Sequence, residues 1–134
     1  MTTIGSDAFY ECTSLETITI GKSVITIGSS AFYSCSSLLS VTIPDSVTSI
    51  GMFSFSSCSS LSSVTIHDCV TSIGPYAFSH CDALKTIHIG KSVTTIGDNA
   101  FSDCSSLTTI TVDETNPSFS ADESGVLFNK EKTT

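Results

Sequence analysis

The sequence predicts a repeat solenoid, in which successive coils stack and their strands line up as a parallel β-sheet. Three kinds of residue recur at a fixed step of 23 positions. The cysteine column is Cys12, Cys35, Cys58, Cys81 and Cys104. The leucine column is Leu15, Leu38, Leu61, Leu84 and Leu107. A β-branched column follows at Ile18, Val41, Val64, Ile87 and Ile110. A single unit of this length cannot bury its own apolar face, so we expect the units to stack.

Each unit contains three predicted segments. Residues 15–20 place apolar side chains at Ile18 and Ile20 with threonine between them, the alternation of a half-buried strand. Residues 24–28 form a second short extended segment that ends at a glycine. Residues 30–35 favour a turn of α- or 3₁₀-helix with Ala31 and Phe32 facing inward. Stacking at the strand spacing of about 4.8 Å then turns each column into a ladder along the axis.

The repeat resembles the BspA-like leucine-rich repeat family. The matching residues are the Cys12-x-x-Leu15-x-x-Ile18-x-Ile20 core, the Val24-x-x-Ile27-Gly28 segment and the Ala31-Phe32 pair. The resemblance covers residues 4–112, with departures at Ser54 and Cys69. It implies a curved right-handed solenoid with the parallel sheet on its concave face, short second strands and helical or 3₁₀ turns on the other faces. It also implies an adhesin or surface protein of bacteria or trichomonads.

The domain organisation follows from the repeat. Residues 1–112 form an array of nearly five coils, and residues 113–134 break the period with a polar loop and a strand over 125–130. This segment is expected to be a C-terminal cap or the start of a truncated module. The chain is interpreted as a piece of a longer protein. No signal peptide is visible in it, and the resemblance implies a cell-surface or secreted location.

The charge balance excludes some classes of partner. The formal net charge is −8, with five lysines and no arginine. Nucleic-acid binding and docking on an anionic membrane both need clustered basic residues. No apolar run approaches the roughly 18 residues of a membrane span. We therefore expect neither nucleic acid nor membrane insertion.

The cysteines favour a packing role. Five of the six fall in one column beside core leucines, where a free thiol packs as a small hydrophobic group and can donate to a carbonyl. A disulfide framework is the alternative, which a regular ladder does not favour. Cys69 replaces a serine of its column and is expected to be partly exposed; a reactive thiol there is the less favoured interpretation. The absence of a Cys-x-x-Cys pair argues against zinc.

Catalytic constellations are missing from the pattern. His67, His80 and His88 fall in three different columns, whereas a catalytic or metal site needs converging groups. The Gly-Lys-Ser triplets at 21–23 and 90–92 lack the upstream glycine of a phosphate-binding loop. No enzymatic activity, cofactor or metal is expected. Ion pairs are expected between neighbouring coils, joining Lys22 to Asp45 and Lys91 to Asp68.

The outward positions of the predicted strands are the best binding candidates. They are Thr17, Thr19, Leu39, Ser40, Thr42, Ser63, Thr65, Lys85, Thr86, His88, Thr109 and Thr111. This surface is rich in hydroxyl groups and poor in charge. Solubility combined with β-propensity explains it as well as protein binding does. An ice-binding surface is a third, less favoured interpretation.

Aromatic residues form a second candidate patch. Phe53 and Tyr76 share a column and lie on adjacent coils, and so do Tyr10 and Tyr33. Aromatic side chains are enriched in binding hot spots, although packing between neighbouring coils also explains them.

The resemblance implies a non-enzymatic recognition or adhesion module that binds host extracellular-matrix or cell-surface proteins, and the outward strand positions and aromatic residues are its candidate binding surfaces. The alternative is a structural solenoid that self-associates through its coil ends or aromatic columns.

Overall fold

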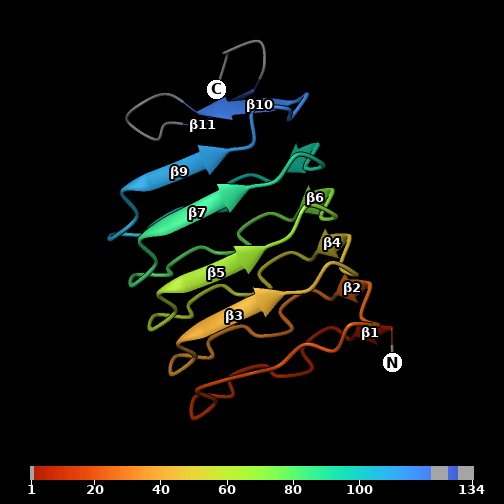
Figure 1. The fold of residues 1–134 in the computed structure, drawn as a ribbon. Coiled ribbons are helices and arrows are strands. Elements are labelled where there is room, and N and C mark those ends of the chain that lie inside the picture. The colour runs from red at the N-terminus through yellow and green to blue at the C-terminus, as the bar shows by residue number, and fades with distance from the viewer. Residues whose placement is uncertain (1, 122–126, 130–134) are drawn as a thin grey trace.

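The strands of the protein repeat along the chain and stack in space. The computed structural model describes residues 2–121 and 127–129. The strands are β1 (Thr3–Ile4), β2 (Thr26–Ile27), β3 (Ser40–Ile43), β4 (Ser49–Ile50), β5 (Ser63–Ile66), β6 (Ser72–Ile73), β7 (Thr86–Ile89), β8 (Thr95–Ile96), β9 (Thr109–Val112), β10 (Phe119–Ala121) and β11 (Leu127–Asn129). Figure 1 shows the coils piled one above another, with β3, β5, β7 and β9 along one side. The predicted solenoid with parallel strands is confirmed.

The short second strands form a continuous ladder. They pair in parallel in the order β1-β2-β4-β6-β8, so that Ile27 lies opposite Ile50 and Ile50 opposite Ile73. Glycine follows each of these strands, and at Gly28, Gly51, Gly74 and Gly97 the adjacent coils approach very closely. A Cβ atom on Gly51 would lie 2.7 Å from the carbonyl carbon of Gly28. Any larger residue would therefore push adjacent coils apart.

The longer strands pair less completely than the repeat predicts. All four residues of β3 pair with β5, and all four of β7 pair with β9. Within the described residues, β5 and β7 are not paired as one ladder. In the first coil, the strand predicted over residues 15–20 is reduced to a single bridge between Thr17 and Ser40.

The predicted helical turns are not confirmed. In the part of the chain that the structure describes, residues 28–37 and their equivalents form hydrogen-bonded turns and no helix. Ser30 and Ser34 have φ of 55°, a left-handed conformation that interrupts a right-handed helix. Alternate N–H groups also point to the next coil, as when Phe32 N donates to Ser54 O at 2.8 Å. Bonding between coils thus replaces bonding along a helix.

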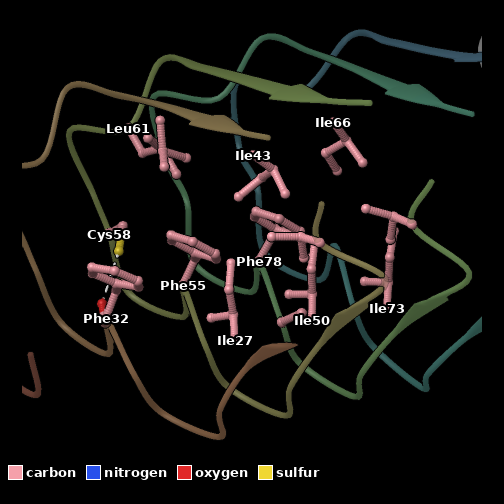
Figure 2. Packing of buried hydrophobic residues seen from close by; sticks show 14 of the residues in the cluster. Ile27, Phe32, Ile43, Ile50, Phe55, Cys58, Leu61, Ile66, Ile73 and Phe78 are labelled. Atoms are coloured by element: carbon pink, nitrogen blue, oxygen red, sulfur yellow. Dashed lines mark hydrogen bonds between the residues drawn. The ribbon is translucent and has the colours of Figure 1, made fainter. Parts of the chain in front are cut away.

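The core consists of side-chain ladders, which Figure 2 shows from close by. Phe32, Phe55 and Phe78 are fully buried, and their rings stack with centroids 5.0 and 5.3 Å apart. Cys58 is also fully buried, and its Sγ donates to the carbonyl of Phe32 at 3.2 Å. The Sγ atoms of Cys35, Cys81 and Cys104 likewise donate to the phenylalanine carbonyl of the preceding coil, at Phe9, Phe55 and Phe78. The predicted packing role of the thiols is therefore confirmed.

Burial favours the protonated form of the Cys35 and Cys58 thiols. It raises the pKa of Cys35 to about 11 and that of Cys58 to about 12. The neighbouring Cys104 side chain and desolvation by burial also raise the pKa of the Cys81 thiol. Cys69 is exposed, as expected for a residue that replaces a serine in a turn.

A buried asparagine changes the direction of the chain after β9. Asn116 stands 23 residues after Val93, in the apolar valine column, and is 1% exposed. Its Nδ2 donates to the carbonyls of Gly90 and Val93 at 2.8 and 3.0 Å. Its Oδ1 accepts from the N–H groups of Ser118 and Phe119 at 2.7 and 2.9 Å. The chain then enters β10, which pairs antiparallel with β11.

The predicted strand over residues 125–130 falls partly outside the described residues. Its described part, residues 127–129, is β11.

Candidate functional site

The candidate strand face lies on β3, β5, β7, β9 and the equivalent segment of the first coil. The outward residues are exposed in every coil, at Thr17, Thr19, Leu39, Ser40, Thr42, Ser63, Thr65, Lys85, Thr86, His88, Thr109 and Thr111. The ladders bring many of them side by side, for example Thr42 with Thr65 and Thr86 with Thr109. The structure therefore gathers the predicted residues on one face, where their side chains are free to contact a ligand.

The chemistry of this strand face is dominated by hydroxyl groups. His88 Nδ1 lies 2.8 Å from Thr111 Oγ1, which fixes the imidazole ring across two adjacent strands. Leu39 is the large apolar member and is 51% exposed. Lys85 and Glu16 add one charge of each sign in the flanking column. Such a surface can offer hydrogen bonds and one apolar contact, with little net charge.

A cavity of about 540 Å³ opens at one end of the strand face. It lies where the first coil separates from β3 after the bridge between Thr17 and Ser40. Its lining is Ile18, Thr19, Ile20, Lys22, Thr42, Pro44, Asp45, Ser46 and His67. The columns could not predict this cavity, because a strict repeat implies uniform spacing between all coils.

The expected ion pairs between lysine and aspartate are wrong. Asp45 pairs with His67, whose Nδ1 lies 3.1 Å from the carboxylate. Among residues 2–121 and 127–129, neither Lys22 nor Lys91 lies within ion-pair distance of a carboxylate. Both groups of the His67–Asp45 pair are largely exposed, so the interaction contributes at most about 1 kcal/mol.

The three histidines have separate neighbours. His67 lies beside Asp45, His88 beside Thr111, and His80 Nε2 lies 3.7 Å from a carboxylate oxygen of Asp103. The described part of the chain holds no cluster of three or more His, Cys, Asp or Glu side chains that could bind a metal ion. The described residues form strands and turns and include no helix long and apolar enough to cross a membrane.

The predicted aromatic pairs are joined into one surface, which we call the aromatic ribbon: Tyr10, Tyr33, Phe53 and Tyr76. Tyr10 stacks on Tyr33 with centroids 5.1 Å apart, and Phe53 stacks on Tyr76 at 4.9 Å. Tyr33 and Phe53 meet edge to face at 6.3 Å. The ribbon runs along the turns, on a different side of each coil from the strand face.

The role of Asn116 in shaping the turn after β9 was not predicted from the sequence. Its signal was available, since it is a polar residue at the next step of a valine column. Its four hydrogen bonds fix the turn that carries the chain from β9 to β10.

Comparison with known proteins supports the repeat assignment. The sequence profile of the BspA type leucine rich repeat region matches residues 2–123 in six copies. No curated protein sequence matches the chain.

Several solved structures of bacterial proteins are similar to this chain. A leucine-rich cell surface protein from Faecalibacterium prausnitzii is 40% identical, with a TM-score of 0.75 over 96% of this chain and 40% of that protein. A leucine-rich repeat protein from Bacteroides ovatus is 43% identical, with a TM-score of 0.78 over 81% of this chain and 28% of that one. The pneumococcal vaccine antigen PcpA is 30% identical, with a TM-score of 0.89 over 99% and 33%. This chain therefore spans less than half the length of each of these three proteins.

Proposed function

This chain belongs to the BspA-type leucine-rich repeat family, and on that basis we propose that it is a non-enzymatic adhesion module. The module is displayed at the cell surface or secreted, and it binds extracellular-matrix or cell-surface proteins of a host or another cell. The location is supported by the description of the Faecalibacterium relative as a cell surface protein. The binding role is supported by the geometry of the strand face.

The observation that carries the proposal is the exposed hydroxyl array on the strand face. Thr42 and Thr65 lie opposite each other in the ladder, and both side chains are exposed. A rigid strand holds these groups at fixed spacing, so binding costs little conformational entropy. Repeat solenoids offer an extended surface of this kind to protein ligands.

Two further features support recognition over catalysis. The three histidines lie beside different partners and do not converge, whereas acid–base or nucleophilic catalysis needs groups in mutual contact. The strand face also has few charges, which suits the hydrogen-bonded and apolar contacts of a protein interface.

The interrupted pairing between β5 and β7 within the described residues disfavours the regular template that ice binding needs.

The test is a quantitative binding assay with surface-exposed proteins extracted from host cells. We compare the wild-type chain with the triple variant Thr42→Lys, Thr65→Lys and His88→Lys, which places three ammonium groups on the strand face. The expected result is capture of a defined set of proteins by the wild type and a loss of at least about tenfold in the variant.

A matched control carries the same added charge elsewhere. The variant Thr48→Lys, Thr71→Lys and Thr94→Lys changes three exposed residues of one column that lies outside the strand face. This control should bind as the wild type does. Equal capture by all three proteins would exclude the strand face, and light scattering that shows concentration-dependent oligomers without a ligand would favour self-association.

A further inference from the structure

The aromatic ribbon is continuous although its residues come from two columns. In the first two coils the rings are those of Tyr10 and Tyr33, and in the next two coils they are those of Phe53 and Tyr76. The column of Tyr33 continues as Ser56, which is 2% exposed. The aromatic ring therefore moves from the Tyr33 column to the Phe53 column between the second and third coils. Tyr33 and Phe53 meet edge to face there, with centroids 6.3 Å apart, which joins the two pairs of rings.

Core packing does not account for the rings. Tyr10 and Tyr76 are 46% and 36% exposed. Phe53 and Tyr76 also have φ of 56°, a left-handed conformation that is unfavourable for bulky side chains. The same column holds Ser30 and Asn99 in the same conformation. The backbone therefore accepts small polar residues here, and the two rings add exposed apolar area at an energetic cost.

We define the turn segments as residues 5–14, 28–37, 51–60, 74–83 and 97–106. Apart from His80, every ionisable residue of the turn segments that is charged at neutral pH is acidic. The turn segments carry five exposed carboxylates, namely Asp7, Glu11, Asp82, Asp98 and Asp103. They contain no lysine, because the chain places Lys22, Lys85 and Lys91 in other segments. Five of the thirteen acidic residues of the chain thus lie in the turn segments, where no lysine neutralises them.

The carboxylates flank both ends of the ribbon. Desolvation raises the pKa of the Tyr10 phenol, and the negative charges of Glu11 and Asp7 raise it further. At the other end, Tyr76 N donates to the carbonyl of Asp98 at 3.1 Å, which brings that residue alongside. Asn99 Nδ2 donates to the Tyr76 hydroxyl at 3.0 Å and holds the ring in place.

We propose that the aromatic ribbon is a second binding surface, specific for a segment of a partner protein rich in lysine or arginine. Long basic side chains suit it because their methylene stems pack on apolar surface while their charged ends reach carboxylates. A second copy of this chain is disfavoured as the occupant, since two such acidic faces repel each other. The ribbon is separate from the strand face, so this proposal and the adhesion proposal can fail independently.

The probe is a fluorescent synthetic peptide in which Lys-Leu pairs are separated by Gly-Ser spacers, measured by fluorescence anisotropy. Its counterpart has glutamate in place of every lysine. We expect binding of the basic peptide only, with an affinity that falls as salt is added. The variant Phe53→Ser with Tyr76→Asn introduces residue types already present in that column, and it should weaken binding by about tenfold.

Two charge variants separate specific binding from general attraction to an acidic protein. Asp7→Ser, Glu11→Ser and Asp98→Ser remove three carboxylates from the turn segments. Glu16→Ser, Asp45→Ser and Asp68→Ser remove three from other segments and have the same net charge. Only the first set should weaken peptide binding by about tenfold.

Several outcomes would overturn the proposal. They are an absence of basic-peptide binding, equal losses in the two charge variants, and unchanged affinity in the Phe53→Ser, Tyr76→Asn variant. Concentration-dependent oligomers that this variant abolishes would assign the ribbon to a second copy instead. Circular dichroism and thermal unfolding of each variant establish that the fold is retained.

Discussion

Replacing Ser54 with alanine should stabilise the protein, although the change removes a polar group and adds nothing. Ser54 is fully buried, and its Oγ has no hydrogen-bond partner among the described residues. Its column holds Ala31 and Ala77 on the adjacent coils, and both are also fully buried. The site therefore fits a methyl group, and the hydroxyl group of Ser54 is desolvated on folding without gaining a hydrogen bond.

The magnitude follows from the cost of an unsatisfied hydroxyl. Leaving a buried polar group without a partner costs about 1–3 kcal/mol. Alanine differs from serine by one oxygen atom, so the cavity left behind is small. The backbone bonds of residue 54 do not involve the side chain; its carbonyl still accepts from Phe32 N at 2.8 Å. We expect Ser54→Ala to raise the free energy of unfolding by about 1–2 kcal/mol.

The assay is urea denaturation followed by circular dichroism, with Ser56→Ala as the matched control. Ser56 lies two residues away and is also buried, but its Oγ lies 2.8 Å from Ser79 Oγ. Removing this partnered hydroxyl should lower the free energy of unfolding by about 0.5–1.5 kcal/mol. The same substitution thus has opposite signs at the two sites. A Ser54→Ala variant that is less stable than the wild type would refute the reasoning.

Three other predictions concern the core and its ends. Asn116→Ala should lower the free energy of unfolding by about 2–4 kcal/mol, because it removes four hydrogen bonds from a buried turn, and hydrogen exchange at the amides of Ser118 and Phe119 should accelerate. The contribution of the Cys58 thiol to stability should be constant below its ordinary pKa and fall from about pH 9 to pH 12, since the unfolded thiol ionises there while the raised pKa of about 12 keeps Cys58 protonated in the fold. Denaturation at several pH values tests this, and a Cys58→Ala variant should show a shallower decline between about pH 9 and pH 12. At neutral pH a thiol reagent should modify Cys69 first and leave Cys58 unmodified until the protein unfolds, which mass spectrometry of partly labelled protein can check; rapid labelling of Cys58 in the native state would contradict the structure.

The outward strand residues show how far the columns could predict a site. An alternating strand sends every second side chain to the same face, so Thr42 and Thr65 had to be neighbours once the coils were known to stack. The cavity near Lys22 and Asp45 could not be predicted in this way. It depends on the departure of the first coil from β3, and nothing in the spacing of the columns distinguishes that coil from the others.

The turn segments illustrate a different limit. The Ala-Phe pairs and their serine neighbours fit one helical turn locally, and the predicted inward positions of Ala31 and Phe32 agree with their burial. The backbone nevertheless adopts left-handed conformations at Ser30 and Ser34. Bonds to the next coil stabilise these conformations, and such bonds exist only after stacking. Local propensity therefore identified the buried residues but not the conformation of the segment.

The amino-acid sequence by itself determined the repeat length, the register of the ladders and the residues that form the core, because identical side chains at a fixed step can be buried only by stacking. Tertiary structure alone decided where that regularity is broken. The interruption between β5 and β7, the edge-to-face contact of Tyr33 with Phe53 and the hydrogen bonds from Asn116 to the previous coil each depend on residues that lie 20 or more positions apart. The periodicity indicates which residues occupy equivalent positions. The packing of side chains of different size and polarity decides how far the conformations and contacts of these residues differ.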